Sequence, residues 1–241
     1  MSNNKLLVLI GSGPGIGVAT ASLFASNGFN VALLSRSASR LESDAATIRS
    51  AAATPDIKIE SLPCDASDAA SLNSALEKVH ATLGSPEVVI YNAARVGPSE
   101  FGQFTPEEMV QDYKLNSVGI YVAAMWALPY LAQIAEEGGK PGFFLSGSGI
   151  GWRPLPPFFS LCMQKAAQIN FLQSFEYLAG PKGVHVARLD INGIVSPDDP
   201  ETSPKVCAQQ HWALYQQQKG QWDSVKQVGD MEAFAKKMGF P

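Results

Sequence analysis

The sequence contains few cysteines, and they follow no recognised pattern. Three cysteines, Cys64, Cys162 and Cys207, are spread over 241 residues. The number is odd and no C-x-x-C spacing occurs, which excludes a disulfide framework and a zinc or redox motif of that type. We expect free thiols in a reducing compartment.

Charge and histidine are also sparse. Charged residues make up 17% of the chain, and 18 Lys and Arg against 22 Asp and Glu give a net charge of −4. Because the basic residues form no run, we expect no nucleic-acid partner. His80, His185 and His211 share no ligand-like spacing, so we expect no metal site.

Long hydrophobic runs and linkers are missing as well. The apolar run at residues 5–10 ends in glycine and is too short for a signal peptide core or a membrane span. No repeat or linker divides the chain. We therefore expect a cytoplasmic protein without a membrane partner, folded as a single domain over residues 1–241.

What the sequence does contain is short apolar segments that alternate with helical patterns. The expected strands are residues 5–10, 30–35, 57–62, 87–92, 142–147 and 184–191, with a possible edge strand at 221–228. The expected helices are 15–27, 38–52, 67–83, 106–136 and 158–179, followed by a loop and helix within 198–218. Apolar strands separated by single helices predict an α/β, doubly wound, Rossmann-like parallel sheet. Ligands bind such sheets at the carboxyl ends of the strands, here the loops after residues 10, 35, 92, 147 and 191.

A glycine-rich turn follows the first expected strand. Gly11, Gly15 and Gly17 have the spacing G-x-x-x-G-x-G. Glycine lets the backbone approach a pyrophosphate, which then lies at the positive end of the next helix. Between a strand and a helix, this pattern predicts dinucleotide binding by residues Gly11, Ser12, Gly13, Gly15, Ile16 and Gly17.

The end of the second expected strand indicates which dinucleotide binds. Arg36, followed by Ser37, stands where a carboxylate would favour NAD by accepting a hydrogen bond from the ribose. A guanidinium instead suits a 2′-phosphate, so the sequence predicts NADP(H) as cofactor. Arg40 lies nearby, and one of the two arginines could simply be a solvated surface residue.

These features, with several others, resemble the short-chain dehydrogenase/reductase family from Lys5 to about Pro197. The resemblance rests on the glycine motif, on "CDAS", on "YNAA", on Asn116 in "YKLNSVG", on Ser148 in "FFLSGSG" and on Lys165. It implies cofactor contacts from Asp65, Ala66, Asn92, Ala93, Ala94, Lys165, Gly193 and Ile194, and catalytic roles for Asn116, Ser148 and Lys165. It also implies a homodimer or homotetramer built from the helices at 106–136 and 158–179.

The chain departs from this family where the proton donor belongs. The family carries Y-x-x-x-K, but Leu161 stands four residues before Lys165 and thirteen after Ser148. Leucine has no proton to give, and loss of a general acid typically removes roughly 10²–10⁴ in rate. The neighbours Ser160 and Cys162 point elsewhere on a helix, whereas Tyr91 and Tyr121 are weak candidates for a replacement.

The sequence therefore leaves three functions open. The first is an NADP(H)-dependent oxidoreductase with a modified active site, acting on a small or medium apolar carbonyl or imine. The others are a non-redox enzyme that keeps NADP(H) as a structural wall and a catalytically silent NADP(H)-binding protein. A segment at about 193–218 is expected to cover the substrate. An apolar wall could come from Trp152, Phe158, Phe159 and Trp212, for which ordinary packing is an equal alternative.

Overall fold

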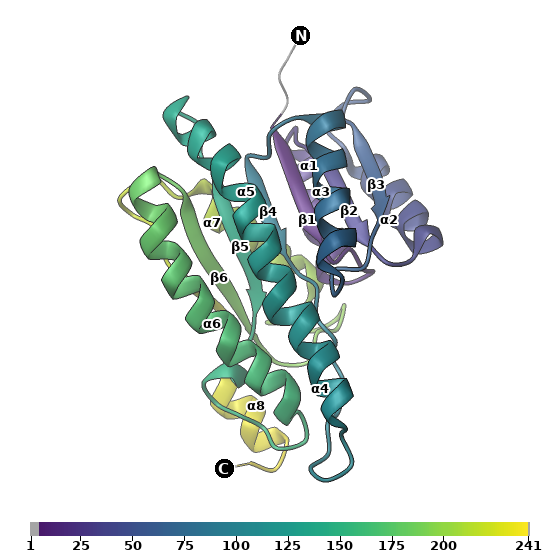
Figure 1. The fold of residues 1–241 in the computed structure, drawn as a ribbon, viewed down its shortest axis with the longest axis vertical. Coiled ribbons are helices and arrows are strands. Elements are labelled where there is room, and N and C mark those ends of the chain that lie inside the picture. Colours follow the sequence, from purple (N-terminus) through teal and green to yellow (C-terminus); the bar gives the residue numbers. More distant parts are fainter. Residues whose placement is uncertain (1–4, 241) are drawn as a thin grey trace.

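A seven-stranded parallel sheet forms the centre of the molecule. The computed structural model describes residues 5–240, and its strands lie in the order β3-β2-β1-β4-β5-β6-β7 (Figure 1). The strands are β1 (Leu6–Ile10), β2 (Asn30–Ser35), β3 (Ile59–Pro63), β4 (Val88–Tyr91), β5 (Gly142–Gly147), β6 (His185–Asn192) and β7 (Val225–Gly229). The chain order reverses between β1 and β4, which is the crevice where such sheets bind ligands. The predicted fold class is confirmed.

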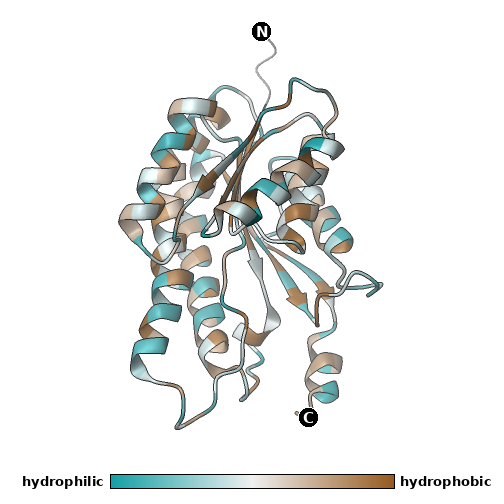
Figure 2. Cartoon of the chain, turned by 90° about the vertical axis from the view of Figure 1, so that its right-hand side faces the viewer, coloured by the Kyte–Doolittle hydropathy of each residue, from teal (hydrophilic) through white to brown (hydrophobic). Residues whose placement is uncertain are grey.

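Helices cover both faces of this sheet. They are α1 (Ile16–Ser26), α2 (Ala38–Ala51), α3 (Ala69–Leu83), α4 (Pro106–Tyr113), α5 (Gly119–Glu136), α6 (Phe159–Ala179), α7 (Pro204–Gln216) and α8 (Met231–Lys237). Side chains alternate along each strand, so β1 sends Val8 into the core beneath α3, α5 and α6 and Leu9 into the core beneath α1, α2 and α7. Burial on both faces explains the continuous apolar strands, which Figure 2 shows as largely hydrophobic.

The helix expected over 106–136 is divided in the structure. It begins with a capping box, in which Thr105 accepts from the backbone of Glu108 and the Glu108 side chain accepts from the backbone of Thr105. A π-helical turn, Lys114–Val118, then separates α4 from α5. Such a turn is common at functional sites, and it contains Asn116.

The carboxyl-terminal part of the chain differs most from expectation. The edge strand begins at Val225, later than predicted, and it is followed by α8, which the sequence patterns did not indicate. Asp230 caps α8 by accepting from the backbone of Glu232 and Ala233. The helix lies beside the first turn of α6 (Figure 1), so it contributes to the region around Leu161.

Candidate active site

The glycine turn is held tightly between β1 and the end of β4. Gly11 has a φ of +95°, and a Cβ placed there would lie 2.4 Å from the backbone nitrogen of Ala93. Asn92 Nδ2 donates to the Gly11 carbonyl oxygen over 2.8 Å, which ties the two loops together. Glycine is therefore required at this position by both conformation and space.

The amino terminus of α1 is open toward this turn. Its N-cap residue is Gly15, and among the described residues no side chain caps it. Backbone N–H groups at an uncapped helix start attract anions, assisted by the helix dipole. Behind the turn, Ser12 Oγ donates to the buried Asp44 of α2 over 2.7 Å, which fixes the backbone that would face a phosphate.

A polar cleft continues from this turn along the ends of β2, β3 and β4. Its lining includes the predicted residues Gly11, Ser12, Gly13, Arg36, Ser37, Asp65, Ala66, Asn92, Ala93 and Ala94, together with Arg40. Burial raises the pKa of the Asp65 carboxyl, but hydrogen bonds from Ser67 and the charge of Arg36 outweigh it and lower that pKa. Arg36 and an ionised Asp65 thus face one cleft that is large enough for an adenosine.

A second, larger cavity of about 560 Å³ adjoins the polar cleft and shares Gly13, Asn92 and Ala94 with it. It contains the remaining predicted cofactor residues Gly15, Ile16, Gly17, Lys165, Gly193 and Ile194. Most of its other walls are apolar: Val96, Ile150, Leu155, Phe158, Leu161, Ile191, Val195 and Phe234. The two spaces therefore lie side by side, with the glycine turn between the polar cleft and the apolar chamber.

Lys165 is a buried cation in the wall of this chamber. Its Nζ donates to the carbonyl oxygen of Ser146 on β5 over 2.9 Å. Burial lowers the pKa of the Lys165 ammonium to about 8, and the nearby charge of Asp190 opposes that shift. The group therefore gains and loses a proton close to neutral pH.

The other two predicted catalytic residues take different positions. Ser148 lines the chamber, where its Oγ donates to the Ile191 carbonyl oxygen over 3.0 Å. Asn116 is fully buried behind the chamber and lines neither space. Its Nδ2 donates to the Asp112 backbone carbonyl oxygen, and the Asn116 backbone carbonyl oxygen accepts from Gln168 Nε2. The structure brings Ser148 and Lys165 together and places Asn116 in the layer that supports them.

Leu161 belongs to an apolar cluster that closes the far side of the chamber. It is 5% exposed and packs with residues of α8 and of the turn before α6. Leu161 and Lys165 are four residues apart in α6, so both project from the same helix face. The wall beside the ammonium is therefore hydrocarbon.

The candidate replacement acids do not reach the chamber. Tyr91 is fully buried, its hydroxyl donates to the Leu115 carbonyl oxygen, and burial raises the pKa of its phenol far above the usual value. Tyr121 is 54% exposed and lies against Phe171 on the outside of α5. Neither tyrosine can therefore donate a proton to a substrate in the chamber. Ser160 donates to Asp112, and Cys162 donates to the Leu155 carbonyl oxygen, so these neighbours are also engaged elsewhere.

The expected aromatic wall is only partly present. Phe158 lines the chamber, whereas Phe159 stacks on Phe101 outside it. Trp212 packs edge-on against Phe24 beneath the opposite face of the sheet, so it cannot contact a substrate there. Within the segment 193–218, residues 193–195 line the chamber while α7 packs against α1.

Two functional features escaped the sequence reasoning. Phe234 of α8 lines the chamber, but its position follows only from the fold of the final residues. Asp190 is a fully buried carboxylate in β6 that was read simply as part of an apolar strand. A charged residue inside such a strand was the available signal, because charges are rarely buried without a partner.

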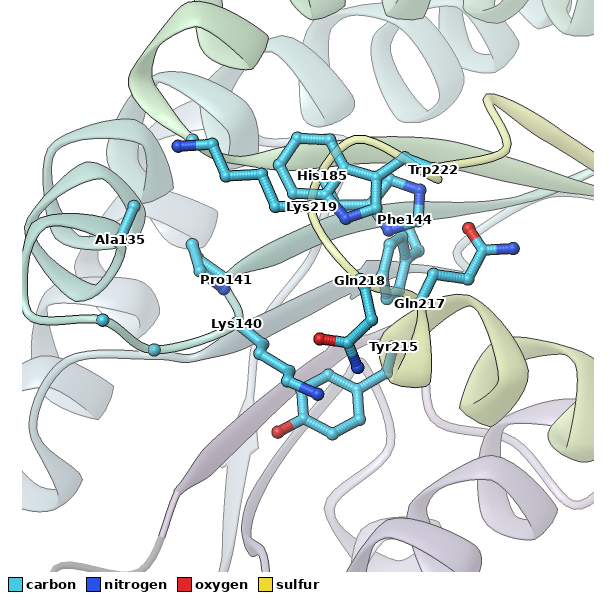
Figure 3. Close-up of a pocket in the computed structure, with 13 residues that line it drawn as sticks. Ala135, Lys140, Pro141, Phe144, His185, Tyr215, Gln217, Gln218, Lys219 and Trp222 are labelled. Carbon is cyan, nitrogen blue, oxygen red and sulfur yellow. The ribbon is translucent and has the colours of Figure 1, made fainter.

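A different hollow lies at the opposite, amino-terminal edge of the sheet (Figure 3). Trp222 stacks on His185 there, and Lys140 and Lys219 extend from two loops. The carboxyl ends of α5 and α7 meet this edge, where lysines complement the negative pole of each helix dipole. None of the predicted site residues lines this hollow, so the candidate active site lies at the carboxyl-terminal edge of the sheet.

Comparisons with known proteins agree with this arrangement. A 2,3-dihydro-2,3-dihydroxybenzoate dehydrogenase of Bacillus subtilis is 23% identical over 98% of this chain and 82% of the relative. An alcohol dehydrogenase of the archaeon Thermococcus sibiricus, solved with 5-hydroxy-NADP, superposes with a TM-score of 0.81 at 20% identity, over 94% of this chain and 97% of that one. An NADH-dependent reductase, A1-R', solved with NAD, gives a TM-score of 0.81 at 17% identity, over 94% and 95%.

Solved relatives of the same fold thus hold either nicotinamide dinucleotide. The sequence model described as short chain dehydrogenase matches residues 5–201, which is most of the chain. The glycine turn, the cleft beside it and the buried lysine all lie within that span. The protein belongs to the short-chain dehydrogenase/reductase family of oxidoreductases.

Proposed function

We propose that this protein is an NADP(H)-dependent oxidoreductase with a modified active site, acting on a small or medium apolar carbonyl or imine. The observation that carries the proposal is that the polar cleft at the Gly11 turn and the Lys165 chamber adjoin and share lining residues. A dinucleotide lying in it would place its phosphates at the start of α1 and its nicotinamide beside Lys165. When bound, the nicotinamide supplies a hydride.

The choice of NADP(H) over NAD(H) rests on charge. Arg36, Ser37 and Arg40 line the part of the cleft where the adenosine ribose would lie. Both guanidinium groups are exposed, and among the described residues neither forms an ion pair with a carboxylate. A 2′-phosphate would give them a partner through charge-assisted hydrogen bonds.

The substrate class follows from the walls of the chamber. Apart from Ser146, Ser148, Lys165 and Asn92, the side chains that border it are hydrocarbon or aromatic. We place Leu161 at the position where other family members carry the proton-donating tyrosine. A quaternary iminium needs a hydride but no proton, so such a substrate would be reduced readily, and a ketone much more slowly.

The test is a paired assay with purified protein. NADPH consumption is followed with an apolar cyclic iminium and with a ketone of the same size. The proposal predicts oxidation of NADPH that depends on substrate, with the iminium consumed faster. Faster turnover of the ketone would contradict the modified site, and no turnover of either would contradict the oxidoreductase.

Leu161 also supports a second candidate, in which NADP(H) is bound but not turned over. A non-redox enzyme would then use the apolar chamber for cyclisation, isomerisation or elimination, and a silent protein would bind cofactor alone. Product formation with unchanged NADPH identifies the first of these. Binding of NADPH without any product from a broad substrate panel identifies the second.

We also propose a homo-oligomer formed through α4, α5 and α6. Residues 106–136 are long and apolar enough to cross a membrane by composition, yet only 39% of their most apolar window is buried. Tyr113, Tyr121 and Met163 are each more than half exposed on these helices. A second copy would cover this surface. Light scattering should give a dimer or tetramer, and a monomer would contradict the proposal.

A further inference from the structure

The following inference rests on the proposed function and concerns the source of the missing proton. We propose that Lys165 itself protonates the oxygen of a carbonyl substrate, and that Asp190 is the positioning residue that keeps Lys165 charged. Ketone reduction in this protein then proceeds through an ammonium instead of a phenol. A positioned acid of any kind contributes typically 10²–10⁴ in rate, so such a donor would matter.

Asp190 is held in place by two side chains. It lies fully buried in β6, and Arg188 Nε lies 3.1 Å from each of its carboxylate oxygens. The Trp152 indole also donates to it. A buried carboxylate is costly unless it is paired in this way, so its orientation is fixed by its surroundings.

The position of the Asp190 carboxylate explains a glycine in the neighbouring strand. Gly147 pairs in register with Asp190, and a Cβ on Gly147 would lie 2.5 Å from Asp190 Oδ1. Gly147 also lines the chamber, next to the Ser146 carbonyl oxygen that Lys165 contacts. The carboxylate therefore occupies the space that a side chain at position 147 of β5 would otherwise fill.

The Lys165 ammonium has N–H groups that make no hydrogen bond within the described residues. A protonated lysine carries three N–H groups, and in the part of the chain that the structure describes Nζ makes only the bond to Ser146. Lys165 faces the chamber from the same helix face as Leu161, one turn further along. Because leucine offers no competing hydroxyl, the free N–H groups are the nearest acidic protons on that face.

Few other charges act on this lysine. β6 contributes Asp190 and Arg188, while β5 and the turn at residues 149–151 carry no ionisable side chain. Asp112 of α4 is occupied by Arg95 and Ser160, and Lys114 of the π-helical turn is exposed. Burial lowers the pKa of Lys165 to about 8, and Asp190 is the charge that opposes this fall. The lysine thus stays largely protonated at neutral pH.

The proton and electron balance of the step is simple. The carbonyl carbon receives a hydride, which carries both electrons and comes from NADPH. The carbonyl oxygen takes a proton as an N–H bond of Lys165 breaks, which leaves a neutral amine. Water then returns a proton to Lys165. The sum is ketone, NADPH and a proton giving alcohol and NADP⁺.

The pH dependence follows from the direction of proton transfer. Reduction of a ketone requires the charged form of Lys165, so its rate should fall as the pH rises through about 8. An Asp190→Asn variant loses the carboxylate that favours the ammonium, so the pKa of Lys165 should fall. The alkaline limb for the ketone should then move to lower pH by the same amount.

A quaternary iminium provides the internal control, because its reduction consumes no proton. The ketone-to-iminium rate ratio should fall with pH in the native protein and shift to lower pH in Asp190→Asn. Lys165→Arg keeps a positive charge but cannot release its proton, so this ratio should drop at least tenfold. Glu77→Gln, which removes one negative charge from the exposed side of α3, should leave the ratio unchanged.

A second readout does not depend on turnover. NMR of protein carrying ¹³Cε-lysine, without cofactor, should show one resonance that titrates near pH 8, vanishes in Lys165→Arg and moves down in Asp190→Asn. If Asp190→Asn does not fold, the native titration and the native rate ratio still decide the matter. A ratio that is constant across pH 8, or unaffected by Lys165→Arg, would overturn the proposal.

Failure of the proposed function has a different signature. In that case neither the iminium nor the ketone would be reduced, whatever the NMR titration shows, and the lysine proposal would fall with it. A protein that reduces the iminium normally but gives a ketone rate independent of Lys165 would overturn only the lysine proposal.

Discussion

The cofactor cleft and the substrate chamber differ in the polarity of the residues that line them. The cleft is made by glycine backbone, by Arg36 and Arg40, and by the carboxylates Asp44 and Asp65. The chamber is lined largely by hydrocarbon and has one charged side chain in its wall, Lys165, while the carboxylate of Asp190 is buried outside its lining. We therefore expect the cleft to bind an anionic cofactor. In the chamber we expect a small change in the pKa of Lys165 to change the rate of the reaction.

The largest expected effect concerns the glycine turn of the cleft. Gly11→Ala would combine a φ of +95° with a collision against the Ala93 backbone, so NADPH binding should be lost and stability should fall by several kcal/mol. Calorimetry and thermal unfolding measure both. Gly28→Ala is the matched control, since Gly28 has a φ of +87° but open space. It should cost only about 1–2 kcal/mol and keep NADPH binding.

The chamber is tested by returning a phenol to it. Leu161→Tyr should raise ketone reduction, because a phenol would add a second proton donor beside Lys165. The gain should be smaller than the roughly 10²–10⁴-fold that a general acid contributes where no other donor is present. Leu161→Phe supplies the same ring without the hydroxyl and should give no gain. Equal rates for the two variants would show that the absent tyrosine is not what limits the chamber.

A third prediction concerns His211 of α7, which lies beside Ser146 of β5. His211 is fully buried near Ser146 Oγ, and burial lowers the pKa of its imidazole to about 4 from 6.5. The unfolded chain therefore takes up a proton first as pH falls, and stability is lost between about 6.5 and 4. We expect His211 to account for roughly 2 kcal/mol of this loss.

Chemical unfolding at neutral and acidic pH measures this dependence. His211→Gln should reduce the difference in the free energy of unfolding between neutral and acidic pH. His80→Gln, on the outer helix α3, should not change that difference. A variant that retains the full loss would show that His211 is not its source. His185, whose pKa is also lowered by burial, would then be the next residue to change.

The smallest expected effect distinguishes the two nicotinamide cofactors. Arg36→Gln should weaken NADPH binding about tenfold, the worth of one charge-assisted hydrogen bond, and leave NADH binding unchanged. Lys78→Gln, on the exposed side of α3, is the control for loss of charge. Equal weakening of both cofactors would indicate that Arg36 does not contact the 2′-phosphate.

The same contrast explains what could be predicted from sequence. The glycine spacing and Arg36 are local signals, and the structure places these residues along the polar cleft and the adjoining chamber. Parallel strands were recognisable because burial on both faces demands continuous apolar runs. The spacing from Leu161 to Lys165 is likewise local, and it correctly placed both side chains on one helix face.

The chamber depended on contacts between distant residues, which no local pattern encodes. Phe234 reaches it from the last helix, and Asp190 lies near Lys165 only because β5 and β6 are neighbours. The π-helical turn at Asn116 was hidden within a continuous helical pattern, since one extra residue in a turn barely changes the apolar period. Tyr91 looked available at a strand end, but its hydroxyl is used by the Leu115 carbonyl oxygen.

Titration of the native protein with NADPH and with NADH in a calorimeter tests the central claim most directly. The account predicts saturable binding of NADPH, weaker binding of NADH, and loss of the difference in Arg36→Gln. Absence of measurable heat with either cofactor, from protein that unfolds cooperatively, would contradict it.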